Sequence, residues 1–242
     1  MKTTTRKYNN TPISHLNCLV LLVATMLIGV STLCSAEKAF TADKDTVELW
    51  NFDECAGTTA ANEMPNAINI TSKALEWGTG KFGGALAFKG DKIVLVYPVA
   101  IPLDKSVTAE AWIKIDEGES GKRMGILQNM VFKKAGFRMH ISTDNHIVWN
   151  VESEGTELYV VSKASVFPGD WIHVAGTYDG QSLCVYVNGE LSGTAAASTG
   201  NLTIPPTYLL IGYTDAGELP HFYGLIDAIR ISNTARKEFL KP

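Results

Sequence analysis

The sequence predicts an all-β protein built as a two-sheet sandwich or a barrel. From Val47 onward, short runs of Val, Ile, Leu, Tyr, Phe and Trp end repeatedly at Gly, Asp, Asn or Pro. Several of these runs alternate apolar and polar residues, which is the period of a half-buried strand. No window longer than about ten residues carries the apolar stripe of a helix. About a dozen short strands at regular spacing indicate a single all-β domain.

The expected strands follow one another without a linker or a change in composition. They cover residues 47–52, 85–90, 93–98, 107–115, 125–132, 137–142, 146–152, 158–162, 171–178, 182–189, 207–212 and 225–232. Residues 234–242 could form one short helix. A core of this size, at roughly 25 cal/mol for each Å² of apolar area, can offset the chain entropy without a metal or a disulfide.

The segment Trp171–Glu190 predicts a three-stranded meander. Gly180 can take the positive φ angle of the first turn, and Asn188-Gly189 is the strongest two-residue hairpin signal. His173 shares a strand face with Trp171. No acid or nucleophile is next to His173 in the sequence, so the pattern favours a structural histidine that bonds to a neighbour over a catalytic base.

The first 36 residues have the layout of a secretory signal peptide. Basic residues precede an apolar run over 18–30, and the small residues at Cys34-Ser35-Ala36 predict cleavage after Ala36. The expected location is therefore secreted, periplasmic or at the cell surface. The alternative is an uncleaved N-terminal anchor, and only this alternative would attach the protein to a membrane. Residues 37–242 form the predicted domain.

Charge and cysteine content narrow the function. Without the leader the chain has 18 basic and 25 acidic residues, a net charge of −7. An acidic chain without a basic cluster repels phosphate backbones, so nucleic acid is not an expected partner. The cysteines after residue 36 are Cys55 and Cys184. An exported protein can hold a disulfide, but two separate, partly buried thiols are the favoured interpretation.

Several segments together resemble LamG-like jelly-roll domains of the concanavalin A-like lectin/glucanase superfamily, which are related to laminin G and pentraxin modules. The segments are LWNFDE (49–54) with GTTA (57–60), GKFGGALAF (80–88), VTAEAWI (107–113), WIHVAGTYDG (171–180), LCVYVNGE (183–190) and GLIDAIRIS (224–232). The resemblance covers residues 46–236. It implies a jelly-roll sandwich of two curved antiparallel sheets with a concave face. It does not imply one function, because this fold hosts lectins, glycanases and adhesion modules.

The resemblance also implies a structural calcium site. Positions that match the ligands of the superfamily are Asp53, Asp227 and the turn Lys89-Gly90-Asp91, where Gly90 would contribute its backbone. Carboxylates and carbonyls are the ligands that Ca²⁺ prefers. The alternative is that both aspartates only cap turns or pair with Lys89 and Arg230.

Catalysis is not expected. The E-x-D-x-x-E strand that is common in glycanases of the superfamily is absent, and so are the HExxH and G-x-S-x-G patterns. Aromatic side chains near the ends of strands are the candidates for stacking on a sugar. They are Trp149, Tyr159, Tyr213, His221 and Tyr223. The sequence thus predicts a secreted, non-catalytic module that binds carbohydrate or a surface glycoprotein. The alternatives are a protein-interaction module and a degenerate glycoside hydrolase.

Overall fold

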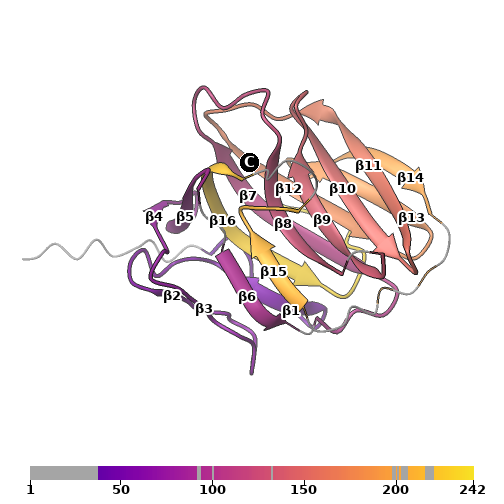
Figure 1. Ribbon diagram of the computed structural model, residues 1–242, viewed down its shortest axis with the longest axis horizontal. Coiled ribbons are helices and arrows are strands. Elements are labelled where there is room, and N and C mark those ends of the chain that lie inside the picture. The colour runs from indigo at the N-terminus through magenta and orange to yellow at the C-terminus, as the bar shows by residue number, and fades with distance from the viewer. Residues whose placement is uncertain are drawn as a thin grey trace, which may run out of the picture. The chain divides into compact units, whose positions relative to one another are not determined.

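The computed structural model describes residues 38–91, 94–99, 101–131, 133–197, 200, 202, 207–215 and 221–242. Within the unit Cys34–Pro242, these residues form antiparallel sheets and contain no helix. The two large sheets pack face to face, as Figure 1 shows, so the predicted jelly-roll sandwich is correct. Residues 234–242, which could have formed a helix, have no regular structure. The predicted signal peptide, residues 1–36, lies outside the described residues.

The first sheet has eight strands and receives both ends of the domain. Its order is β14 (Glu190–Ala196), β13 (Ser182–Val187), β12 (Trp171–Tyr178), β7 (Val107–Ile115), β16 (Tyr223–Ser232), β5 (Gly84–Lys89) and β4 (Trp77–Thr79). The first strand, β1 (Thr46–Trp50), pairs with the second half of β16 beside β5. A small separate sheet joins β2 (Thr59–Ala60) to β3 (Ile70–Thr71).

The second sheet has six strands. Its order is β11 (Thr156–Ser165), β10 (His146–Ser153), β9 (Ala135–Ile141), β8 (Met124–Val131), β15 (Thr207–Ile211) and β6 (Val94–Val99). At one side of the sandwich, β11 meets β14 of the other sheet, where the Ala164 amide donates to Ser192 Oγ at 2.9 Å. The two sheets are therefore joined along this edge.

Alternation along each strand builds the core between the sheets. Ala109, Ala111 and Ile113 of β7 face Phe137 and Trp149 of the second sheet, and all of these side chains are buried. The other face of β7 carries Thr108, Glu110 and Trp112, as the period of two requires. Trp112 belongs to a second, smaller apolar cluster with Phe40, Leu49 and Ala228 on the outer face of the eight-stranded sheet. That outer face is thus covered rather than open.

The predicted meander is present as β12, β13 and β14. Asn188 and Gly189 both have positive φ angles, 52° and 78°, as a tight hairpin turn requires. The Asn188 side chain also accepts a hydrogen bond from the His173 amide at 2.9 Å, and the Asn188 amide donates to the His173 carbonyl at 2.8 Å. Asn188 therefore holds the start of β12 against the hairpin.

The cysteine interpretation is right for one residue and wrong for the other. Cys184 carries a free, half-buried thiol, whereas Cys55 is in a disulfide. The two cysteines are consequently not paired with each other. The expectation of two free thiols is based only on the cysteines after residue 36.

Over the part of the chain that the structure describes, no helix has the length and apolar character that crossing a bilayer would need.

Candidate functional site

A hollow on the outer face of the six-stranded sheet gathers polar and aromatic side chains. It has a volume of about 500 Å³ and is formed by β9, β10 and β11, together with Arg123 before β8 and Ser142 and Thr143 after β9. The lining residues from the strands are His140, Val148, Asn150, Glu157, Tyr159 and Val161. Strand pairing places them in order, because Asn150 lies opposite Tyr159, and Val148 lies between His140 and Val161.

Polar side chains form the floor of this hollow, although they point away from the core. His140 is only 2% exposed and Asn150 only 5%. At the wall, Tyr159 is 61% exposed. Outward-facing side chains of a sheet are normally solvated, so shielded polar groups beside an exposed aromatic ring are unusual. A flat apolar ring next to directed polar groups is an arrangement that suits a sugar.

His140 is neutral in this position. Burial, together with the nearby guanidinium groups of Arg123 and Arg138, lowers the pKa of His140 to about 3. A guanidinium can only donate, and Arg123 Nη2 lies 3.1 Å from His140 Nε2, so Nε2 is the acceptor. The ring proton then lies on Nδ1, which is buried and has no hydrogen-bond partner among the described residues. His140 thus has an unused donor.

Asn150 has an unused acceptor beside it. Its Nδ2 donates to Glu157 Oε1 at 2.8 Å, whereas its Oδ1 is buried without a partner. Glu157 also forms a salt bridge with Arg138. Buried polar atoms are nearly always hydrogen-bonded in proteins, so unpaired ones in a concave surface indicate a place where a ligand or water binds.

A second candidate site joins the two predicted calcium ligands. Asp227 Oδ2 accepts hydrogen bonds from the amides of Lys81 and Phe82 at 2.8 and 2.9 Å, and Asp227 is fully buried. Burial, together with the charge of the nearby Asp53, raises the pKa of Asp227 to about 7 against the opposing effect of the two amide hydrogen bonds. Burial also raises the pKa of Asp53, although the Gly84 amide opposes this effect. The structure therefore brings Asp53 and Asp227 together.

The donor atoms at this pair fit a hard cation. Asp53 Oδ1 and Asp227 Oδ1 are both buried and lack hydrogen-bond partners. The surrounding backbone is strained, since Phe52, Cys55 and Ala228 have positive φ angles of 56°, 56° and 49°. No group of three or more acidic, histidine or cysteine side chains that could hold a metal occurs among the described residues. A cation here would be held by Asp53 and Asp227, with backbone carbonyls or water as its other ligands.

Gly90 is not part of this pair. It follows the end of β5, where Lys89 pairs with Tyr223, whereas Gly84 at the start of β5 is the residue beside Asp53. Gly84 and Gly90 are six positions apart along this extended strand, which is roughly 20 Å at about 3.4 Å for each residue. A Cβ at Gly90 would overlap the Tyr223 ring, so this glycine is needed for packing.

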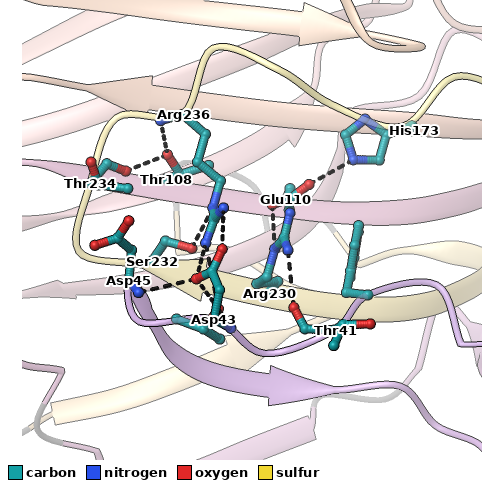
Figure 2. Close-up of polar contacts among 12 residues, drawn as sticks. Thr41, Asp43, Asp45, Thr108, Glu110, His173, Arg230, Ser232, Thr234 and Arg236 are labelled. Carbon is teal, nitrogen blue, oxygen red and sulfur yellow. Dashed lines mark hydrogen bonds and ion pairs between the residues drawn. The ribbon is translucent and has the colours of Figure 1, made fainter.

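A buried ion cluster explains the histidine of the meander. His173 Nε2 lies 3.0 Å from Glu110 Oε2, and Arg230 Nε donates to Glu110 Oε1 at 2.7 Å, as Figure 2 shows. Glu110 and His173 are both fully buried. Burial alone would raise the pKa of Glu110, but the hydrogen bond from His173 and the charge of Arg230 hold it below its ordinary value. The structural interpretation of His173 is correct, because a fully buried ring cannot reach a substrate.

The two ends of the domain cover this cluster. Arg236 forms a bidentate ion pair with Asp43, in which Nη1 donates to Oδ2 at 2.8 Å and Nη2 donates to Oδ1 at 2.7 Å (Figure 2). Phe239 packs against His173 with 5.6 Å between ring centroids, and the guanidinium of Arg230 lies 4.7 Å from the centre of the Phe40 ring. The two terminal segments therefore form a lid over Glu110 and His173.

Residues 88–238 match the family described as the concanavalin A-like lectin/glucanases superfamily. The chain belongs to this superfamily. Solved structures of similar shape share little sequence with this chain. The binding domain of Paraclostridial Mosquitocidal Protein 1 has a TM-score of 0.61 at 13% identity, covering 79% of this chain and 49% of that one. Such likeness shows the shared fold alone.

Two further proteins are similar to this chain. Domain 4 of an extracellular GH43 arabinanase from Geobacillus stearothermophilus, solved with arabinotriose, has a TM-score of 0.59 at 16% identity and covers 79% of this chain and 93% of that one. Pappalysin-1 of Mus musculus is 24% identical over 156 residues, which are 55% of this chain and 10% of pappalysin-1. The chain thus matches only a small part of that relative.

The predicted aromatic candidates are distributed over different places of this superfamily fold. Tyr159 lines the hollow. Trp149 is fully buried in the core, with Nε1 donating to the Thr177 carbonyl at 3.1 Å, so its prediction as a ligand contact is wrong. Tyr213 and His221 form an isolated β-bridge, and their tilted rings pack with 5.0 Å between the ring centroids. Tyr223 lies under the Lys122 ammonium. Neither this bridge nor Tyr223 is part of the hollow.

Arg123, His140 and Asn150 are functional candidates that were not predicted from the sequence. A signal was present, because polar residues at alternate positions interrupt the strands 137–141 and 146–152. The predicted candidates were aromatic residues near strand ends, so these polar residues were not among them. Glu110 was missed as the partner of His173 for a similar reason, since the pairing of β7 with β12 is not visible in one strand alone.

Proposed function

We propose that this domain is a non-catalytic binding module that takes a saccharide, free or on a surface glycoprotein, in the hollow of β9, β10 and β11. The observation that carries the proposal is the pair of unpartnered buried atoms, His140 Nδ1 and Asn150 Oδ1, beside the exposed ring of Tyr159. One donor, one acceptor and a stacking surface are what a sugar ring with several hydroxyl groups requires.

The comparisons support binding as the general role. The arabinanase domain was solved with arabinotriose, and two structures of similar shape are described as receptor binding domains of botulinum neurotoxins, one with a TM-score of 0.59 at 12% identity. The lining of the hollow also argues against glycoside hydrolysis, which needs two carboxyl groups. Among the described lining residues, Glu157 has the only carboxylate, and it is engaged by Arg138 and Asn150.

Binding to a glycan array, repeated with Tyr159→Ala, tests this function. Loss of the stacking surface should weaken glycan binding at least about tenfold, as removal of an aromatic hot spot typically does. Phe167→Ala is the matched control, because Phe167 is 58% exposed and does not line the hollow. A stable protein complex without glycan binding would instead support the interaction module, and turnover of a β-glucan would support the hydrolase.

We further propose that the protein is exported and that Asp53 and Asp227 hold a structural calcium ion. Export is supported by the leader pattern, and the test is N-terminal sequencing of the exported protein, where Glu37 should be the first residue. Recovery of the intact chain in a membrane fraction would instead establish the uncleaved N-terminal anchor. The calcium proposal is supported by Asp53 Oδ1 and Asp227 Oδ1, which are buried and have no hydrogen-bond partner among the described residues.

A further inference from the structure

The hollow contains an arginine without an acidic partner. The described residues include four arginines, and three of them pair with carboxylates: Arg138 with Glu157, Arg230 with Glu110, and Arg236 with Asp43. In the part of the chain that the structure describes, Arg123 forms no ion pair, and its hydrogen-bond partner is the His140 ring. The charge of Arg123 is therefore not neutralised within the hollow.

Acids close to the hollow are already engaged. Glu157 bonds to Arg138 and Asn150, Asp144 bonds to the hydroxyl of Ser142, and Glu119 pairs with Lys122. The charged lining residues are Arg123 and Glu157, and Glu157 is already paired with Arg138, so Arg123 is the lining charge that is left for a ligand. An unpaired guanidinium in a hollow favours an anionic ligand over a neutral one.

His140 orients the guanidinium without cancelling its charge. A carboxylate in the place of His140 would also hold Arg123, but it would neutralise the group. The neutral ring occupies one donor of Arg123 Nη2 and leaves other guanidinium donors for a ligand. A guanidinium fixed from one side is well suited to bind a carboxylate or a sulfate with two parallel hydrogen bonds.

From this arrangement we infer that the ligand of the hollow is an anionic saccharide, whose carboxylate or sulfate group is bound by Arg123 while its ring stacks on Tyr159. This inference rests on the proposed saccharide-binding function and names its substrate class. Arg123 is the contact residue for the anion, and His140 is a positioning residue. Asn150 Oδ1 and His140 Nδ1 are then available to the hydroxyl groups of the same ligand.

The test compares acidic glycans with their neutral parents on one array: sialylated with desialylated, sulfated with desulfated, and uronates with their methyl esters. The wild-type protein should bind acidic members and not their parents, and increasing salt should weaken the binding. Titration calorimetry with the strongest acidic glycan should show at least about a tenfold weaker affinity for Arg123→Gln, and a smaller loss for Arg123→Lys. Lys73→Gln removes one exposed positive charge outside the hollow and should change nothing.

Variants of His140 separate positioning from general packing. His140→Glu would supply the missing acid to Arg123 and should abolish binding of the anion, whereas His140→Gln keeps an acceptor and should retain part of it. Equal binding of acidic and neutral glycans that depends on Tyr159 would overturn the anionic ligand and leave the proposed function intact. Anion binding that survives Arg123→Gln would also overturn the inference. No binding to any glycan would overturn both.

Discussion

His140 lies on a strand between two guanidinium groups, and this position determines its response to acid. Its pKa is lowered to about 3 by burial and by Arg123 and Arg138, whereas an unfolded histidine titrates near 6.5. The unfolded chain therefore binds a proton that the folded protein excludes. The free energy of unfolding contributed by this residue is fully present above about pH 6.5, and it is lost as the pH falls toward 3.

Replacing His140 by Gln should make the protein less sensitive to acid. The difference in unfolding free energy between wild type and His140→Gln should shift in favour of the variant as the pH falls from 7 to 4, by up to about 1.4 kcal/mol for each pH unit. Urea unfolding at several pH values measures this difference. Carboxyl groups with raised pKa values, such as Glu48 at about 7, titrate in both proteins and cancel in the comparison. Parallel pH curves would show that His140 has no such role.

At the level of single residues, the sequence points to one residue at the wall of the hollow and to none of its floor. Tyr159 was a candidate because it is an aromatic residue near the end of a predicted strand. Trp149 has the same residue class but the opposite strand face, and burial on that face makes it part of the core. The floor of the hollow could not be predicted, because it depends on which strands are neighbours, and the pairing of β9 with β10 brings His140 and Asn150 onto one face.

Among the strands, β10 and β12 show how closely the sheets approach each other. A Cβ at Gly176 would lie 2.1 Å from Cδ2 of Trp149, so the indole ring packs directly on the backbone of β12. The indole nitrogen also donates to the neighbouring Thr177 carbonyl. The glycine within WIHVAGTY is therefore a packing requirement. Its role was not predicted, since a glycine in a strand does not show which side chain will cover it.

Gly176→Ala should destabilise the fold by about 1–3 kcal/mol, because overpacking forces the buried indole or the strand to move. Chemical denaturation measures this loss. In a Trp149→Leu background, which has already removed the ring, the same substitution should cost clearly less, so the two changes should not be additive. Equal costs in both backgrounds would mean that Trp149 is not the obstacle.

Strands and turns were the most predictable features at this scale. All twelve predicted runs overlap described strands, and the Asn188-Gly189 turn has the expected positive φ angles. The short strands β2, β3 and β4 were missed, because two or three residues carry no measurable alternation. The short C-terminal helix that the sequence allows does not form, and its residues instead cover Glu110 and His173.

At the scale of the whole domain, Asp53 and Asp227 connect its first strand with its last. Asp53 follows β1, and Asp227 lies in β16 at the bulge beside Ala228. Their closeness was implied by resemblance to the superfamily and could not be worked out from the residues alone, since 174 positions of chain separate them in sequence. A cation between them would tie the two ends of the fold.

Calcium should therefore raise the melting temperature, and EDTA should reverse the effect. A ligand that binds only the folded state adds about 2.7 kcal/mol at a hundredfold excess over Kd, which corresponds to roughly 5–10 °C for a domain of this size. Differential scanning calorimetry measures the shift. Asp227→Asn should abolish it, and Asp144→Asn, in the exposed turn after β9, should leave it unchanged. A wild-type melting curve that ignores both calcium and EDTA would rule out the site.

The ion pair of Asp43 with Arg236 places the entry and exit of the domain next to each other. Residues 38–41 and 238–240 line one common depression on the outer face of the eight-stranded sheet, whereas the hollow of β9, β10 and β11 lies on the outer face of the other sheet. A host protein could carry such a domain as an insertion in one of its own loops, with little spacer on either side. The domain would then be attached to the host through the outer face of its eight-stranded sheet, and the hollow of β9, β10 and β11 would face away from the host.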